Sequence, residues 1–185
     1  IGYVEDLDRV NVNDLKAFFL RWYGPNNAVL TIGGDIDVEQ TLVWVNKYFG
    51  SIPTGPEVKQ APKQPAVLTQ DKYITLEDRI QQPMGLIGWP TQYSGQEDEM
   101  SLNALASALG SGANSLLYQK LVKTQKAVDA GAFQDCSELA CNFYIYAMAP
   151  SGDKGQLQLL YQEMMQILAG FETQGISQTR LNQIT

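Results

Sequence analysis

The sequence predicts an α+β protein built of two-layer units, in which helices pack against a sheet. Apolar residues recur at helical spacing in several segments, while other short segments alternate apolar and polar residues as strands do. A proline-rich segment separates two groups of such elements. The 185 residues, 44% of them hydrophobic, suffice for one domain or one and a half with a substantial core.

The first group of elements has the order helix, strand, helix. The helices are indicated by apolar residues three and four positions apart, and the strand by a short β-branched run before two glycines. This order is part of a two-layer unit but cannot close a sheet by itself. The expected elements are a helix over 13–23 capped by Asn13 and ended by Gly24 and Pro25, a strand over 28–32, and a helix over 38–49 capped by Asp37.

A segment without periodicity follows the first group. Residues 50–71 contain four prolines, Pro53, Pro56, Pro62 and Pro65. Proline fixes the backbone and favours extended conformations, so we expect a semi-rigid linker over residues 53–71.

The second group of elements occupies residues 72–185. The run from Met84 to Trp89 is almost entirely apolar, which favours a central position in a sheet. Glu97, Asp98 and Glu99 lie where the dipole of the next helix favours anions. The expected elements are strands over 73–77 and 84–89, helices over 97–109 and from Asn114 or Ser115 to Thr124, a hairpin of strands over 127–135 and 142–149, a long helix over 155–173, and a last helix from Ser177.

The charge and the residue types limit the chemistry. The formal net charge of −7 argues against a surface for nucleic acid or anionic membranes. The chain has no histidine, the commonest general base and metal ligand, so a Ser/His/Asp or Cys/His triad is impossible. We expect no catalytic, cofactor-binding or metal-binding residue in this chain, which does not run chemistry alone.

Two motifs have a structural and a functional interpretation. Residues 109–115 (LGSGANS) are glycine-rich and precede a helix, but a phosphate cradle needs a strand before it and a Walker-type lysine after it. A helix–helix turn with Gly110 as the end of the first helix explains them better. Lys120, Lys123 and Lys126 are more typical of a solvated helix face than of an anion site.

The two cysteines bracket the expected hairpin loop. Residues opposite each other in an antiparallel pair approach closely enough for a disulfide, so Cys136 and Cys141 are a possible bridge. Two free thiols are the alternative, because the redox compartment decides between them.

Two runs of residues resemble a known family. The first run is similar to the end of the first α/β domain of the pitrilysin/insulinase zinc metallopeptidases, which include the mitochondrial processing peptidase. The second is similar to the region after the next strand and helix of these enzymes. The matching residues are Phe18 or Phe19, Tyr23, Pro25, Asn27, Ala28, Gly34, Asp35, Tyr48, Phe49, Gly50, Ile52 and Pro53, and then Leu109, Gly110, Gly112, Ser115, Leu117, Tyr118, Leu121 and Val122.

The resemblance implies a clamshell of paired domains, each a mostly antiparallel sheet with helices on one face. Two such domains form a half, and two halves enclose a peptide. The His-x-x-Glu-His zinc motif lies in the first domain of this family. Residues 1–52 would be the C-terminal part of that zinc-bearing domain, residues 53–71 the linker, and residues 72–185 most of a second, non-catalytic domain. Zinc is then expected in the parent enzyme and not in this chain.

One departure from the family concerns catalysis. Many members carry an arginine and, seven positions later, a tyrosine that would contact the substrate near the scissile bond. The aligned positions here are Val122 and Asp129, and neither matches. The resemblance thus implies a chamber-forming, non-catalytic region whose partners are a peptide substrate and another metallopeptidase half, in the same chain or a second subunit.

Two alternatives remain open at this point. The first is an inactive structural subunit of the same fold, and the second is an unrelated small-molecule binding domain with a deep pocket. No apolar run is long enough for a transmembrane helix. Bacterial relatives are often exported, so the resemblance implies a periplasmic or cell-envelope location, with which a Cys136–Cys141 bridge would agree.

Overall fold

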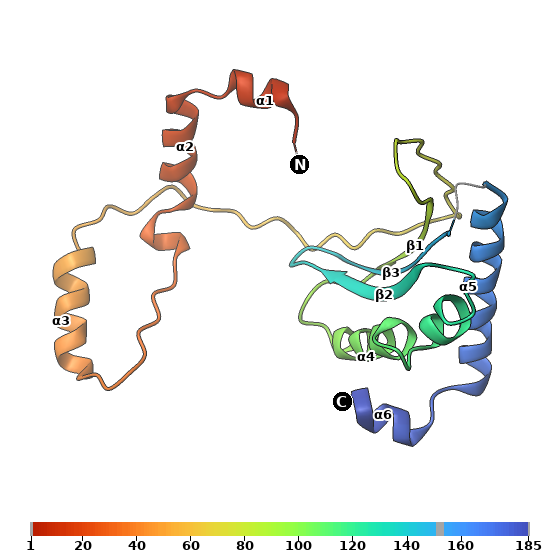
Figure 1. Ribbon diagram of the computed structural model, residues 1–185. Helices are drawn as coiled ribbons and strands as arrows, with labels where there is room; N and C mark the ends of the chain where they lie inside the picture. Colours follow the sequence, from red (N-terminus) through yellow and green to blue (C-terminus); the bar gives the residue numbers. More distant parts are fainter. Residues whose placement is uncertain (1, 151–153, 185) are drawn as a thin grey trace. The chain divides into compact units, whose positions relative to one another are not determined.

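The computed structural model describes residues 2–150 and 154–184 (Figure 1). The chain divides into two compact units, Ile1–Gln60 and Ala61–Thr185. The described residues of the first contain helices joined by turns and extended backbone, and the second contains a sheet and the helices that cover it. The prediction of an α+β class is confirmed.

The helices of the first unit are α1 (Val4–Arg9), α2 (Val12–Trp22), the 3₁₀ turn η1 (Pro25–Asn27) and α3 (Val38–Phe49). Both predicted helices are confirmed. Asp37 caps α3 as expected, by accepting a hydrogen bond from the backbone N–H of Gln40 at 2.9 Å. The cap of α2 is Asn11 and not Asn13, because Asn11 and Asp14 form a reciprocal capping box.

The strand expected over residues 28–32 is absent. This backbone is extended, but it pairs with no other segment in the described part of the chain, and 94% of the Val29 surface is exposed. None of the described helices of the first unit has a buried residue. A strand needs a partner for its backbone groups, so a correct propensity alone does not produce one.

The start of the predicted linker is attached to the turn after α2. The Asn26 side chain accepts a hydrogen bond from the Gly55 N–H at 2.9 Å and donates one to the carbonyl oxygen of Pro56 at 3.0 Å. Residues 53–71 contain no helix or strand. The proline-rich segment is therefore extended, with its first residues held by a side chain of the same unit.

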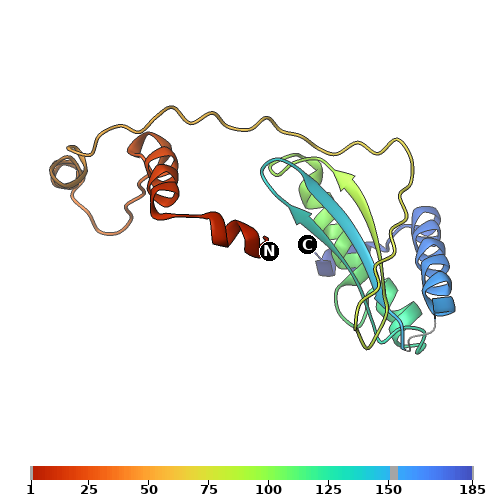
Figure 2. The ribbon, with the colours of Figure 1, turned by 90° about the horizontal axis from the view of Figure 1, so that it is seen from above.

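The sheet of the second unit has three antiparallel strands, β1 (Met84–Thr91), β2 (Asp129–Cys136) and β3 (Cys141–Met148). Their order is β1-β3-β2, so β3 runs between the other two (Figure 2). The hairpin of β2 and β3 is confirmed, with boundaries shifted by one or two residues. Tyr146 pairs with Gly131 on one side and with Leu86 on the other.

Two strand predictions in this unit are wrong. Residues 73–77 form no strand, and their apolar side chains Ile74 and Leu76 are 80% and 87% exposed. β1 lies at an edge of the sheet and not at its centre, with Leu86 52% exposed. A long apolar run fits a central strand only where a strand pairs on each side, and β1 has one partner within the described residues.

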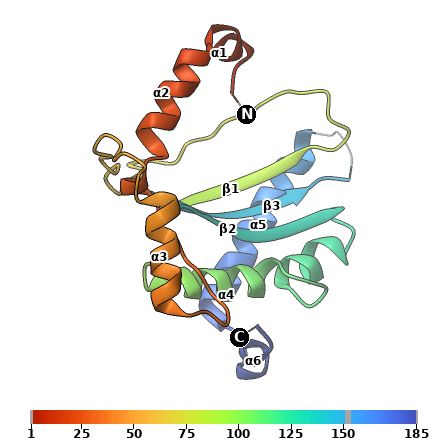
Figure 3. The ribbon, with the colours of Figure 1, turned by 90° about the vertical axis from the view of Figure 1, so that its left-hand side faces the viewer.

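Helices cover one face of this sheet. They are α4 (Asp98–Gly110), the π-helical turn η2 (Tyr118–Val122) and α5 (Lys154–Gln174), while α6 (Gln178–Ile184) packs against α4. In Figure 3, α5 runs behind the three strands. The core between helices and sheet is hydrophobic, mostly aliphatic with Phe143 among its buried members. Its fully buried members include Leu109, Leu117, Leu121, Ile145 and Met164.

Helix α4 approaches β2 very closely at Gly110. A Cβ atom on Gly110 would collide with the backbone of Ala132 and would lie 2.7 Å from the carbonyl carbon of Gly131. Only glycine permits this contact between a helix and a strand. The first glycine of the LGSGANS segment is therefore required by packing.

The loop of the β2–β3 hairpin holds two segments that are distant in sequence. Lys63 forms an ion pair with Glu138 at 2.9 Å, and the Gln64 N–H donates to the Leu139 carbonyl oxygen at 3.0 Å. The Ser94 N–H, beyond the end of β1, donates to the carbonyl oxygen of Ser137 at 3.0 Å. The hairpin loop thus joins the entry of the second unit to the exit of β1.

Candidate functional site

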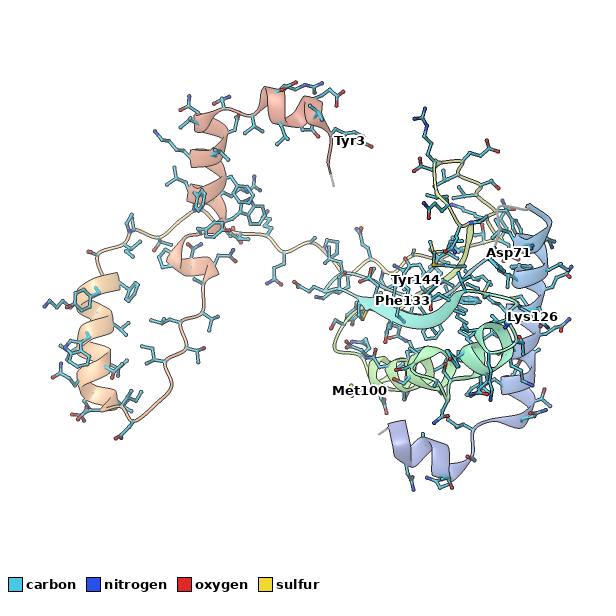
Figure 4. The ribbon with its side chains drawn as sticks, viewed as in Figure 1. Tyr3, Asp71, Met100, Lys126, Phe133 and Tyr144 are labelled. Atoms are coloured by element: carbon cyan, nitrogen blue, oxygen red, sulfur yellow. A yellow bond between two sulfur atoms is a disulfide. The ribbon has the colours of Figure 1, made fainter. Side chains whose placement is uncertain are left out.

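The two faces of the sheet differ in character. Along β3 the buried residues alternate with half-buried ones, because successive side chains point to opposite faces. Phe143, Ile145 and Ala147 point into the core, whereas Tyr144 and Tyr146 lie on the face without helices. This second face, called the open face below, is where the sheet can meet another molecule. Figure 4 shows Phe133 and Tyr144 on the side of the sheet away from α4.

Two glycines allow the tyrosine rings to lie across the open face. A Cβ atom on Gly131 would be 2.7 Å from Cε1 of Tyr146, and one on Gly88 would be 2.8 Å from Cε1 of Tyr144. Each ring therefore occupies the space that a side chain on the neighbouring strand would need. Each ring thus lies over the backbone of the neighbouring strand.

An acidic residue is joined to this aromatic surface. The Tyr146 hydroxyl donates a hydrogen bond to Oδ2 of Asp129 at 3.1 Å. Burial raises the pKa of the Tyr146 hydroxyl, and the hydrogen bond to Asp129 and its negative charge raise that pKa further. The hydroxyl therefore stays protonated at neutral pH and holds the carboxylate beside the ring.

Phe133 completes the group from the edge strand β2. Its ring centroid lies 5.1 Å from that of Tyr144 and 6.3 Å from that of Tyr146, and 43% of its surface is exposed. We call Asp129, Phe133, Tyr144 and Tyr146 the aromatic–acidic patch. It combines flat rings with a solvent-exposed carboxylate, which suits a ligand that is both apolar and cationic.

The sequence did not single out this patch as a site. By the family resemblance, Asp129 is only the position at which the metallopeptidases carry a tyrosine, and Val122 is the position of their arginine. In the structure Val122 packs against the core at the end of η2, and Asp129 begins β2 with its carboxylate exposed. The available signal was the alternation in β3, which places Tyr144 and Tyr146 together on the non-core face.

The cysteines lie at the end of the hairpin. Cys136 and Cys141 are directly opposite each other in the ladder, with Cα atoms 4.1 Å apart, and the structure joins their sulfur atoms. Cys141 is buried, and its N–H donates to the Gln92 carbonyl oxygen at 2.6 Å. The pair is thus placed to close the loop that holds Lys63 and Ser94.

The other motifs have structural roles. Lys126 forms an ion pair with Glu163 of α5, and Ser115 accepts a hydrogen bond from the Tyr118 N–H at 3.4 Å. Gly112 adopts a left-handed backbone with a φ of +73°, as a turn requires. Glu99 accepts a hydrogen bond from the Gly95 N–H at 2.6 Å, so it supports the start of α4.

Within residues 2–150 and 154–184, no group of three or more His, Cys, Asp or Glu side chains is arranged to hold a metal ion. None of the helices in those ranges combines the length and apolar character needed to cross a membrane.

A hollow between α4 and the end of α5 measures about 190 Å³, below the roughly 300 Å³ at which small-molecule sites begin. A larger hollow of about 450 Å³ lies along α2, where Lys16 is its only polar lining residue.

A three-stranded antiparallel sheet with helices on one face defines an α+β domain, and its described part contains no cluster of metal ligands. The profile of the Peptidase M16 inactive domain matches residues 9–185. The chain therefore belongs to this family, the inactive domain of the M16 or pitrilysin-type peptidases, which confirms the resemblance noted in the sequence.

Individual relatives agree with this family. The zinc protease PqqE of Helicobacter pylori is 25% identical over 192 residues, which cover 100% of this chain and 42% of that protein. The non-peptidase homolog YmxG of the same organism is 26% identical over 124 residues, which cover 65% of this chain and 28% of that protein.

The fold is also found in a solved structure. The crystal structure of a protease from Helicobacter pylori superimposes with a TM-score of 0.77 at 22% identity, covering 99% of this chain and 45% of that one. The chain thus spans less than half the length of the proteins it matches.

Proposed function

We propose that the chain forms a non-catalytic wall of the peptide chamber in a zinc-dependent metalloendopeptidase that degrades or processes peptides. The observation that carries the proposal is the match of residues 9–185 to the M16 inactive domain. The relative PqqE is named a zinc protease, which supports peptidase activity for the complete protein that contains this chain. The role of this region is to confine and orient an extended peptide near a metal held elsewhere.

The exposed apolar face of α2 supports the proposed domain boundaries. Phe18 and Phe19 are 52% and 56% exposed, and apolar side chains gathered on one helix face normally pack against another element. We assign residues 1–52 to the C-terminal part of a zinc-bearing domain, residues 53–71 to a linker, and residues 72–185 to the non-catalytic domain. The remainder of the first domain would cover α2.

The residue at position 129 argues against a direct catalytic role. A tyrosine at this position in related enzymes would stabilise negative charge that develops on the scissile carbonyl. A carboxylate such as Asp129 would repel that charge, and Val122 has no donor to replace an arginine. This domain thus belongs to the half that carries its own zinc motif, and a second M16 half, in the same chain or in another subunit, faces it.

Zinc content and peptidase activity test this proposal. The purified 185-residue chain should hydrolyse no quenched fluorogenic peptide and should retain no stoichiometric zinc after dialysis, as measured by mass spectrometry. The longer protein or complex that contains the chain should hydrolyse the peptide and lose activity with a chelator. One equivalent of zinc in the isolated chain, removed only by a chelator, would contradict the proposal.

A second candidate is an inactive structural subunit with the same fold. The similarity to YmxG, a non-peptidase homolog, favours it specifically. The two candidates differ in two observables. The metallopeptidase requires a His-x-x-Glu-His motif and chelator-sensitive hydrolysis in the complete protein, whereas the structural subunit has neither.

A further inference from the structure

We propose that the aromatic–acidic patch binds the side chain of a lysine or arginine in an extended peptide. The inference deepens the proposed function, on which it rests, because it names the kind of residue that the chamber wall recognises. The lysine or arginine side chain would lie against the rings of Phe133 and Tyr146, and its ammonium or guanidinium group would reach the carboxylate of Asp129.

The patch offers acceptors to a cation. Oδ2 of Asp129 accepts the hydrogen bond from the Tyr146 hydroxyl, which leaves Oδ1 and the second lone pair of Oδ2 for a ligand. In the described parts of the chain, no lysine or arginine forms an ion pair with Asp129. The residue is exposed, so a basic side chain can reach it without displacing a protein group.

The whole open face has the charge that such a ligand requires. Two of its residues are acidic, Asp129 and Asp135, and none is basic. The register places its members in four rows across the sheet, which are Asp129, Met148 and Met84; Gly131, Tyr146 and Leu86; Phe133, Tyr144 and Gly88; and Asp135, Asn142 and Pro90. Charge complementarity therefore favours a cationic partner over an anionic one.

The rings are already in place before a ligand arrives. Tyr146 lies over Gly131 and Tyr144 lies over Gly88, so neighbouring backbone limits their movement. A preformed surface loses little side-chain entropy on binding. Ring faces attract ammonium and guanidinium groups, and a nearby carboxylate adds a charge-assisted hydrogen bond.

The surroundings of the patch favour a peptide as the source of the cation. Met84 and Leu86 are 50% and 52% exposed on the same face, where Met84 shares the row of Asp129 and Leu86 shares the row of Tyr146. An extended chain places alternate side chains on one side. Both lie on β1, across β3 from Asp129, so a peptide that crosses the strands with a basic residue at the patch would bring an apolar residue two positions away toward Met84 or Leu86.

Binding of a defined peptide tests the inference. The probe is a short fluorescein-labelled peptide of leucine and alanine with one central arginine, and its control carries citrulline, the neutral isostere of arginine. Fluorescence anisotropy with the 185-residue chain, at low and physiological salt, gives both dissociation constants. We expect the arginine peptide to bind about tenfold more tightly than the citrulline peptide, with the difference falling as salt rises.

Matched variants locate the site. Asp129→Asn should remove the preference for arginine, while Asp135→Asn removes the same charge from the same strand and should change the dissociation constant by less than about twofold. Phe133→Leu should weaken binding by roughly threefold, because it keeps an apolar side chain and removes the ring. Thermal unfolding of each variant checks that the fold is retained.

Three results would overturn the inference: equal binding of the arginine and citrulline peptides, no effect of Asp129→Asn, or equal effects of Asp129→Asn and Asp135→Asn. Its failure is distinguishable from failure of the proposed function. If the chain shows no preference for the arginine peptide while the longer protein hydrolyses peptides in a chelator-sensitive way, only the proposal for the patch is rejected. Arginine-selective binding without any such hydrolysis would remove only the peptidase role.

Discussion

Gly110 at the end of α4 lies directly against the backbone of Ala132 in β2, with no room for a Cβ atom between them. Replacement of Gly110 by alanine should destabilise the second unit by about 1–3 kcal/mol, because the helix or the strand must shift to relieve the overlap. Urea denaturation of the purified variant measures this loss.

The control for this variant is another helical glycine. Gly170 lies within α5, and a Cβ atom there would meet nothing within 4 Å beyond the backbone of its own helix. Gly170→Ala should therefore raise the free energy of unfolding by about 0.5–1 kcal/mol through helix propensity alone. A Gly110→Ala variant as stable as the parent would show that α4 does not pack this closely.

The hairpin should contain a disulfide when the protein is made in an oxidising compartment. Cys136 and Cys141 face each other across the ladder. We expect no free thiol in the denatured, unreduced protein, and a loss of about 2 kcal/mol of stability on reduction, as the chain-entropy model gives for a loop this short. A double Cys→Ser variant should not respond to reductant. Titration of two thiols before reduction would exclude the bridge.

The pKa of Tyr146 predicts a loss of stability at alkaline pH. In the folded protein the pKa of Tyr146 is raised above the ordinary value of 10.0. The stabilisation that this residue gives the folded state is therefore complete below about pH 10 and is lost as the pH rises through the folded-state pKa. Tyr146→Phe should flatten this part of the stability profile. Asp129→Asn should lower the pKa only partly, because burial is the larger cause. Tyrosinate absorbance and denaturation at several pH values measure both effects.

The apolar face of α2 should matter only in a larger protein. Phe19 is more than half exposed here, so Phe19→Ala in the 185-residue chain should change stability by less than about 0.5 kcal/mol. In the complete protein the same substitution should cost about 3–5 kcal/mol if the zinc-bearing domain buries this ring. Lys16→Ala on the same helix is the control and should be nearly neutral in both. Equal, small effects of Phe19→Ala in both proteins would contradict the assignment of residues 1–52.

Local patterns predicted the helices well, because their hydrogen bonds and caps involve residues close in sequence. Residues 38–49 have the same boundaries in the prediction and in the structure. Pairing of strands depends on distant residues, so β-branched runs at 28–32 and alternating residues at 73–77 were assigned to strands that do not form. The prediction of the β2–β3 hairpin was correct because its two strands are adjacent in the chain.

The candidate site shows the same limit. The alternation along β3 places Tyr144 and Tyr146 on the face opposite Phe143 and Ile145. The hydrogen bond from Tyr146 to Asp129 spans 17 residues and depends on the register of the hairpin. The position of both rings further depends on Gly131 in β2 and Gly88 in β1. No pattern within a single strand contains that information.

The loop between β2 and β3 is a mechanical anchor for the second unit. It holds residues 63 and 64 through Glu138 and Leu139, and it holds Ser94 through Ser137. A pulling force on the proline-rich linker would therefore act first on the hairpin loop, at the end of the sheet opposite to Asp129. The link between Cys136 and Cys141 would keep β2 and β3 from separating at that end.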